Sequence, residues 1–292
     1  MKMKFFTGVA LTLIMPFVLS AASAKPANNP QQQFEALPWV QAPAKPKVTD
    51  RAVIALTAQV RYLDASGTNR FLELTGNLPE EDSYTIADKD SGWFAVYTFA
   101  DMGYVKDDEE IDAAALLQQM KDADAAQNEA RREQGLDPLT TVGWAVPPHY
   151  DKATKNLEYG VTLSSPTGQN INYHLRILGR RGVMDAALVT SAGTLQSDLA
   201  EFRAVNKGFA FTLDEGYSAF KDGDKVSEYG LAALVTGGAA AAALKGGLFK
   251  GLLIFLGTFW KLIAAAVVGG AVALRKLFGG KSNETDDDGY QP

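Results

Sequence analysis

Apolar and polar residues alternate most clearly between residues 171 and 189. The apolar members of the first half are Ile171, Tyr173, Leu175 and Ile177, and the polar members between them are Asn172, His174 and Arg176. Because successive side chains of a strand point to opposite faces, this pattern predicts a strand with one apolar and one polar face. The Gly-Arg-Arg-Gly sequence at 179–182 predicts a hairpin turn in which Gly supplies positive φ, and residues 183–189 form the returning strand.

The remaining elements of the central region follow from similar patterns of β-branched, aromatic and helically spaced apolar residues. They are strands at 92–99, 141–148, 157–165 and 208–213, and helices at 111–132 and 194–205. We expect Pro147 and Pro148 to end the strand that contains them, and Asp151 to cap a rigid turn there. This order of elements predicts an α+β domain, built on an antiparallel sheet packed with helices, over residues 48–228.

The N-terminal 24 residues have the pattern of a secretory signal peptide. Lys2 and Lys4 precede an apolar stretch, and the small residues Ala22-Ser23-Ala24 have the pattern of a cleavage site. The alternative is an uncleaved anchor, but the apolar stretch is shorter than the roughly 20 residues that a membrane span needs. We therefore expect export and cleavage after Ala24.

Residues 25–47 are rich in Pro, Gln, Asn and Ala and lack a sustained period. Such a composition is typical of a disordered leader. Phe34, Leu37, Trp39 and Val40 are exceptions, because large apolar side chains either dock on the domain or form a short partner-binding motif.

Residues 229–278 form the most apolar region at the C-terminal end. Within it, 252–274 is a run of 23 residues in which Lys261 is the only charge, which is long enough to cross a membrane core of about 30 Å. The preceding segment, 230–244, is rich in Ala and Gly and is either a second span or a packed juxtamembrane helix. The acidic tail, 279–292, is expected to be disordered.

Basic residues are spaced through this apolar region. On one continuous helix, Lys250, Lys261 and Arg275 would fall on a narrow stripe. A central Lys costs about 2.5–3.5 kcal/mol, which neighbouring apolar residues at about 0.3–0.6 kcal/mol each can offset. The stripe therefore either belongs to a tilted span with a snorkelling Lys261, or faces a partner helix or anionic lipid headgroups. A single span leaves the tail cytoplasmic, whereas a hairpin leaves it outside.

The amino-acid composition excludes some kinds of site and argues against one kind of partner. The chain has no Cys, which excludes disulfides, thiolate metal sites and a Cys nucleophile. Its net charge of −6 argues against nucleic acid as a partner. No cofactor-binding motif is present, so we expect no cofactor.

Four stretches together resemble a known family. They are GWFAVYTFADMGYVKDDEEIDAAALL, GWAVPPHYD, NYHLRILGRRGVM and DKVSEYGLAALVTGGAAA. In this order they resemble the bacterial uncharacterised membrane-anchored protein family, also called domain of unknown function 2167, over about residues 56–278. The resemblance implies a signal peptide, an extracytoplasmic domain and a C-terminal anchor, but no catalytic residues. The element order is also similar to the PsbP/Mog1-like α-β-α sandwich.

Three groups of residues are candidate sites. Arg180 and Arg181, at the hairpin tip, could bind a phosphate, a carboxylate or a lipid headgroup, or could form a solvated turn. Asp107 and Asp108, within an acidic run, could bind Ca²⁺ or Mg²⁺, or complement the dipole of the following helix. The two histidines, His149 and His174, could bind zinc or act in acid–base catalysis, or be hydrogen-bonded structural residues. The sequence has no established metal-ligand or catalytic spacing.

These patterns favour a non-enzymatic protein of the bacterial inner membrane with its main domain in the periplasm. It would bind or scaffold envelope components, with the lipid bilayer and an envelope or membrane protein as partners. One alternative is an envelope enzyme or metal-binding domain that uses Asp107, Asp108, His149 and His174. Another is a subunit of a membrane complex whose C-terminal helices pack through Gly and Ala. The sequence does not predict the oligomeric state.

Overall fold

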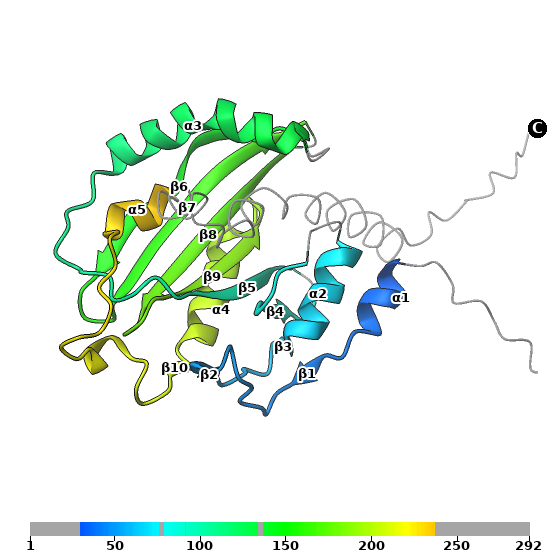
Figure 1. Cartoon of the computed structure of the whole chain (residues 1–292). Helices are drawn as coiled ribbons and strands as arrows, with labels where there is room; N and C mark the ends of the chain where they lie inside the picture. Colours follow the sequence, from blue (N-terminus) through cyan, green and yellow to red (C-terminus); the bar gives the residue numbers. More distant parts are fainter. Residues whose placement is uncertain (1–29, 76–78, 91, 134–136, 167, 237–292) are drawn as a thin grey trace, which may run out of the picture.

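A computed structural model of the chain describes residues 30–75, 79–90, 92–133, 137–166 and 168–236 (Figure 1). The predicted signal peptide, the main apolar span and the acidic tail lie outside the described residues. So do Lys250, Lys261 and Arg275. In the described part of the chain, no helix is long and apolar enough to cross a membrane.

The centre of the fold is an eight-stranded sheet in which every neighbouring pair of strands is antiparallel. Its strands, in spatial order, are β1 (Val40–Gln41), β3 (Val60–Leu63), β4 (Tyr84–Asp88), β5 (Phe94–Ala100), β9 (Val183–Thr190), β8 (Gly168–Leu178), β7 (Asn156–Ser165) and β6 (Thr140–Asp151). A second, two-stranded sheet pairs β2 (Ala52–Ile54) with β10 (Phe209–Phe211). The protein is therefore a mixed α+β fold with a large antiparallel sheet, as the sequence predicts.

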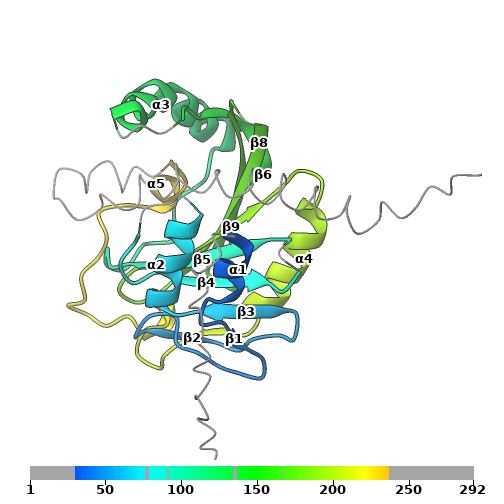
Figure 2. The same cartoon turned by 90° about the vertical axis from the view of Figure 1, so that its right-hand side faces the viewer.

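Helices lie on both faces of this sheet (Figures 1 and 2). One face packs against α4 (Leu195–Asn206) and the small sheet, in an apolar core that includes Phe202, Tyr97 and Tyr173. The opposite face packs against two separate groups of helices. The first group is α1 (Pro30–Glu35) and α2 (Ala65–Leu74), and the second is α3 (Ala113–Glu133) and α5 (Leu231–Thr236). A short 3₁₀ helix, η1 (Tyr217–Ala219), lies in the connection between β10 and α5.

Both faces of β8 are buried from Asn170 to Leu178. The apolar residues of the strand face the core under α4. The polar residues between them face the side that carries α1, α2, α3 and α5. The predicted alternation is therefore present, but its polar half lies inside the protein rather than in solvent. That arrangement requires internal partners for the polar groups.

Strand β6 differs from the prediction at its second half. It continues through Pro147 and Pro148 to Asp151, with register shifts between Val146 and His149. Proline is compatible with this position because β6 is an edge strand, whose outer side needs no ladder donor. The turn begins after the strand, where the Asp151 carboxylate accepts hydrogen bonds from the next residues at Ala153 N and Thr154 Oγ1, each at 2.8 Å.

The Pro- and Gln-rich leader is also different from the prediction of disorder. Its residues from 30 onward form α1 and β1, and Phe34, Leu37 and Trp39 dock on the domain, as the first of the two alternatives for these side chains expects. Val40 is exposed. The Arg61 guanidinium lies 4.2 Å from the ring centroid of Trp39 and 5.1 Å from that of Phe34, and it pairs with Glu35 at 2.9 Å. Leu37 is buried beside them. Aromatic and cation–π contacts thus offset the ordering cost of a segment whose composition by itself predicts mobility.

Candidate functional site

A buried polar network lies on β7, β8 and β9, on the face of the sheet that carries α1, α2, α3 and α5. At its centre, Nδ1 of His174 lies 3.1 Å from each carboxylate oxygen of Asp185, and the two side chains are 2% and 4% exposed. An ionised carboxylate can only accept hydrogen bonds, so the hydrogen of this pair resides on Nδ1 of His174. The contact therefore sets both the tautomer and the orientation of the imidazole.

Arg176 and Tyr159 extend the network. Nη2 of Arg176 lies 3.5 Å from Asp185 Oδ2, and its Nε donates to the Tyr159 hydroxyl at 3.1 Å. That hydroxyl donates in turn to the carbonyl oxygen of Leu234, in α5, at 3.3 Å. The Tyr159 ring stacks on His174 with centroids 4.9 Å apart. A continuous set of contacts thus joins the centre of the sheet to α5.

Strand register explains why these residues meet. Asp185 lies directly opposite Arg176 across β9 and β8, and Tyr159 lies opposite His174 across β7 and β8. Cross-strand neighbours on one face are within reach of each other's side chains. The alternation in β8 supplies the correct face, and the pairing of three strands supplies the partners.

Electrostatics inside the network favour ionised Asp185. Burial on its own raises the pKa of Asp185, but the charge of Arg176 and the contact with His174 outweigh burial and hold it below its usual range. The pKa of Arg176 is raised: burial opposes its charge, and Asp185 more than compensates. Burial raises the pKa of Tyr159 to about 12, so its hydroxyl remains a donor at neutral pH.

Glu80 lies in the loop between α2 and β4. Its side chain is half-buried. Burial, with a further contribution from the charge of Asp185, raises the pKa of Glu80 from 4.5 to about 7. No local sequence pattern distinguishes Glu80 from its neighbour Glu81, so sequence reasoning missed it.

Two further polar residues lie along the same face of β8. Asn170 and Asn172 are 6% and 8% exposed, and neither Oδ1 atom has a hydrogen-bond partner among the residues that the structure describes. Neighbouring strands place Val161 and Val189 directly opposite Asn172. A buried amide oxygen without a donor costs about 1–3 kcal/mol, so these two positions are energetically unfavourable as they stand.

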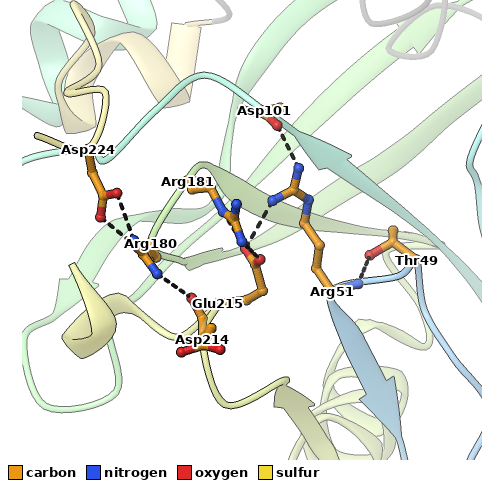
Figure 3. A network of polar contacts seen from close by, with 8 residues as sticks. All are labelled: Thr49, Arg51, Asp101, Arg180, Arg181, Asp214, Glu215 and Asp224. Atoms are coloured by element: carbon orange, nitrogen blue, oxygen red, sulfur yellow. Dashed lines mark hydrogen bonds and ion pairs between the residues drawn. The ribbon is translucent and has the colours of Figure 1, made fainter. Parts of the chain in front are cut away.

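The arginine pair of the hairpin tip has partners within the chain (Figure 3). Arg180 forms a two-point contact with Asp224, Nε to Oδ2 at 2.6 Å and Nη2 to Oδ1 at 2.8 Å. Chiefly through this contact, Arg180 lowers the pKa of Asp224 to about 2. Arg181 binds Glu215, which is 8% exposed. Binding of an external anion by Arg180 and Arg181 stays a prediction, and any such ligand would compete with these carboxylates.

Glu215 is shared between two cations. Besides Arg181, it accepts from Nη1 of Arg51 at 3.0 Å, and Nη2 of Arg51 contacts Asp101 at 2.7 Å (Figure 3). Burial raises the pKa of Glu215, but the bonds from Arg181 and Arg51 hold it below its usual value. This cluster connects the β8–β9 turn to β2, to the end of β5 and to the segment after β10.

The hairpin glycines serve a different purpose from the one predicted. Neither Gly179 nor Gly182 has a positive φ. A Cβ on Gly182 would instead lie 1.9 Å from the carbonyl oxygen of Ala100, and one on Gly179 would lie 2.9 Å from the ring of Phe211. Close approach of neighbouring segments, rather than left-handed backbone, requires glycine here.

The four metal-site candidates are not brought together. Asp107 accepts from Lys155 Nζ at 2.7 Å and Tyr150 Oη at 2.9 Å, and chiefly the bond from Lys155 lowers its pKa. Asp108 and His149 are exposed, whereas His174 is buried in the polar network under α3 and α5. Among the described residues, no three His, Cys, Asp or Glu side chains gather in a way that could hold a metal ion.

The acidic run around Asp107 provides helix caps. Oδ1 of Asp112 accepts from the backbone N–H groups of Ala114 and Ala115, each at 3.0 Å, at the start of α3. Oε2 of Glu109 accepts from Ala232 N at 3.0 Å, at the start of α5. Carboxylates in these positions satisfy free N–H groups and complement the helix dipole.

Comparison with known proteins identifies a family and a distantly similar structure. The family model described as "Protein of unknown function (DUF2167)" matches residues 41–269, a range that contains the buried network and the arginine cluster. No curated protein matches the chain. The solution structure of cyanobacterial PsbP (CyanoP) from Synechocystis sp. PCC 6803 is similar with a TM-score of 0.34 and 10% sequence identity, covering 59% of this chain and 91% of that chain.

Proposed function

The chain belongs to the DUF2167 family of proteins of unknown function, and we propose that it is a membrane-anchored domain of the bacterial envelope that binds or scaffolds other envelope components. In this proposal the domain faces the periplasm and the C-terminal apolar region holds it at the inner membrane. The signal-like N-terminus and the apolar run at 252–274 support that location. The helix layers on both faces of the sheet support a PsbP/Mog1-like sandwich as the fold.

One structural observation carries the proposal: α5 is held firmly to the domain. The Glu109 carboxylate caps its first turn, and the Tyr159 hydroxyl donates to the Leu234 carbonyl oxygen near its end. The side chains of Leu231, Leu234 and Val235 are at most 2% exposed. The chain is therefore fixed to the domain as far as Thr236, ahead of the apolar run at 252–274. Such a junction favours a defined orientation over the membrane, which a scaffold requires.

The candidate groups are engaged within the chain, which gives no support to a catalytic role for them. Arg180, Arg181, Asp107 and His174 all contact oppositely charged or hydrogen-bonding groups of the same chain. Catalytic groups need to reach a substrate, whereas these contacts hold strands, loops and helices together. The metal-binding and enzymatic alternatives gain no supporting observation from the described residues.

The proposal is tested with the full chain and a variant that ends at Thr236, both expressed in bacterial cells with crosslinking in intact cells. We expect the full chain in the inner-membrane fraction, accessible to protease added to the periplasm, and the truncated variant in the soluble periplasmic fraction. Crosslinking should trap a reproducible envelope partner. A full chain that remains soluble, or that crosslinks only to itself, contradicts the proposal.

The α5 junction is tested separately with Glu109→Gln, using exposed Glu110→Gln as the matched control. If a fixed junction orients the domain, Glu109→Gln reduces the yield of the partner crosslink while leaving the membrane fraction unchanged. Glu110→Gln should retain both. Equal crosslinking by the two variants would show that the cap on α5 does not contribute to partner binding.

A further inference from the structure

The Ala- and Gly-rich segment 230–244, which the sequence allows as a second membrane span, begins inside the domain. Its first part is α5, whose first and last turns are bound by Glu109 and Tyr159. Three side chains of α5 are at most 2% exposed and share an apolar core with α3, and they are Leu231, Leu234 and Val235. Insertion of the whole segment into a membrane would break these contacts. The eight residues that remain, 237–244, are far fewer than the roughly 20 that a span needs.

Helix α5 ends beside the polar residues of β8. A carbonyl oxygen in its last turn accepts from the Tyr159 hydroxyl at 3.3 Å, and the Tyr159 ring stacks on His174 with centroids 4.9 Å apart. Asn172 is the next residue on this face of β8, about 7 Å farther along the strand, and Asn170 follows after the same interval. Eight residues extend about 12 Å as a helix and farther as an extended chain, so residues 237–244 are long enough to reach both asparagines.

The direction of α5 also leads toward these asparagines. Its first turn is bound by Glu109, close in the chain to Asp107, which pairs with Lys155 in the turn between β6 and β7. Its last turn is bound by Tyr159, farther along β7. The next residue of β7 on this face lies directly opposite Asn172. A chain that continues in the same direction therefore passes over β8 at this position.

The two groups of described helices leave β8 between them. On β7, Tyr159 and Val161 belong to the apolar core of α3 and α5, and on β9, Ala187 and Val189 belong to that of α1 and α2. Asn172 lies between these strands and is 8% exposed, yet nothing in the described part of the chain donates a hydrogen bond to its Oδ1 atom. The burial of Asn172 thus requires a neighbour that excludes water without donating a hydrogen bond.

The residues that follow α5 have the composition that such a neighbour needs. Residues 237–243 are Gly-Gly-Ala-Ala-Ala-Ala-Ala, and Leu244 follows them. Gly and Ala allow a backbone to approach its neighbours closely, and their side chains carry no polar atom. The same small side chains bury little apolar area, so the segment gains less from entering lipid than a run of Leu, Ile or Phe would.

We propose that residues 237–244 dock on β8 over Asn172 and Asn170, directly after α5, and that the domain thereby keeps this segment out of the bilayer. The chain then crosses the membrane once, at 252–274, and the acidic tail, 279–292, lies on the side opposite the domain. The docking does not depend on the proposed function, whereas the side of the tail rests on the membrane anchor of that proposal.

The distribution of basic residues agrees with a single crossing. Arg275, Lys276 and Lys281 follow the apolar run at 252–274. With one crossing they lie on the cytoplasmic side, where Lys and Arg are in excess next to membrane spans. The tail is then available to cytoplasmic partners while the domain remains in the periplasm.

Disulfide trapping in the purified full-length chain tests the docking. The chain has no Cys, so any bond comes from the introduced pair. Asn172→Cys is combined in turn with a single Cys at each position from 237 to 244, for example Ala240→Cys, and each variant is oxidised. A disulfide needs Cα atoms about 4.4–6.8 Å apart, so we expect efficient bond formation at a subset of these positions. Exposed Ala125→Cys, on α3, is the control partner for Asn172→Cys and should form no bond.

A second scan protects the result against a variant that does not fold. It replaces Asn172→Cys by Val161→Cys, since Val161 lies directly opposite Asn172 on β7. A bond from either position to the segment 237–244 supports the docking. Absence of a bond in both scans, in variants that retain cooperative unfolding, overturns it.

Labelling of the tail tests the single crossing in cells. Spheroplasts that contain the full chain with Ser282→Cys are treated with a membrane-impermeant maleimide, and Ala125→Cys marks the side of the domain. We expect Ala125→Cys to react in intact spheroplasts and Ser282→Cys to react only after detergent is added. A membrane-bound chain whose Ser282→Cys reacts without detergent overturns the single crossing. A chain found in the soluble fraction contradicts the membrane anchor of the proposed function and the crossing with it, and the disulfide scans alone then decide the docking.

Discussion

His174 and Asp185 lie on adjacent strands and share one hydrogen between an imidazole nitrogen and two carboxylate oxygens, each 3.1 Å from Nδ1. Asp185 simultaneously neutralises Arg176, which is 5% exposed. One carboxylate therefore satisfies two buried donors on β8. Both contacts depend on the alignment of β8 with β9, so a change of strand register would separate Asp185 from His174 and Arg176.

Replacing Asp185 by Asn should be strongly destabilising. The substitution preserves shape but leaves the buried Arg176 charge without a counter-charge, which costs about 3–5 kcal/mol in comparable pairs. Denaturant unfolding of the purified chain measures the difference. Exposed Asp222→Asn serves as the control and should change stability by less than about 0.5 kcal/mol. A loss below about 1 kcal/mol for Asp185→Asn would show that water or another group neutralises Arg176.

The two arginines that share Glu215 should be strongly non-additive. Removing Arg181, which is 46% exposed, leaves Glu215 paired with Arg51, and removing Arg51 leaves it paired with Arg181. Each single Ala variant should therefore have a modest effect, whereas the double variant leaves a buried carboxylate without a cation. We expect a coupling energy of about 0.5–3 kcal/mol from a double-mutant cycle. Simple additivity would mean that Glu215 relies on only one of the two arginines.

Gly182→Ala should destabilise the β8–β9 hairpin. A Cβ at this position would lie 1.9 Å from the Ala100 carbonyl oxygen, so the backbone of β5 or the turn must move. Overpacking of this kind costs about 1–3 kcal/mol or more. Gly143→Ala is the matched control, because a Cβ there meets no atom within 4 Å. Thermal unfolding of both variants compares them directly, and equal midpoints would contradict the close approach of the turn to β5.

Asn172→Val should stabilise the protein. The Asn172 Oδ1 atom is buried without a donor from the described part of the chain, and Val161 and Val189 lie opposite Asn172 on the neighbouring strands. Replacing the amide by an apolar, β-branched side chain removes a penalty of about 1–3 kcal/mol and suits a strand. Unfolding in denaturant measures the gain. A loss of stability would instead reveal a hydrogen-bond donor that satisfies this oxygen in solution.

Long periodic segments were predicted well because local spacing determines them. The helix expected at 111–132 spans Ala113–Glu133, and it begins directly after the capping carboxylate of Asp112. The helix expected at 194–205 spans Leu195–Asn206, and the strand expected at 92–99 spans Phe94–Ala100. Each boundary differs by at most a few residues, as expected for element ends that depend on local capping and fraying.

The first third of the domain was not predicted in detail. Strands β2, β3 and β4 are too short for their apolar residues to produce a clear period. Helix α2 does have a local signal that the prediction missed, because Asp64 caps it and its buried residues Thr68, Phe71 and Leu72 follow helical spacing. The polar composition of the leader predicts disorder and its apolar residues left docking open, but the sequence did not show that Trp39 and Phe34 dock through Arg61 on β3. A partner more than twenty residues away is invisible to a local pattern.

The sequence by itself determined the fold class and the two faces of β8, because a period of two is a property of neighbouring residues. It also placed His174 and Arg176 on the same polar face. Only the tertiary structure decided that this face is buried and that Asp185 and Tyr159 are its partners. It likewise paired Arg180 with Asp224 rather than leaving it at a solvated turn. These outcomes depend on strand order and register between distant segments, where burial and counter-charges set the energy of each polar group.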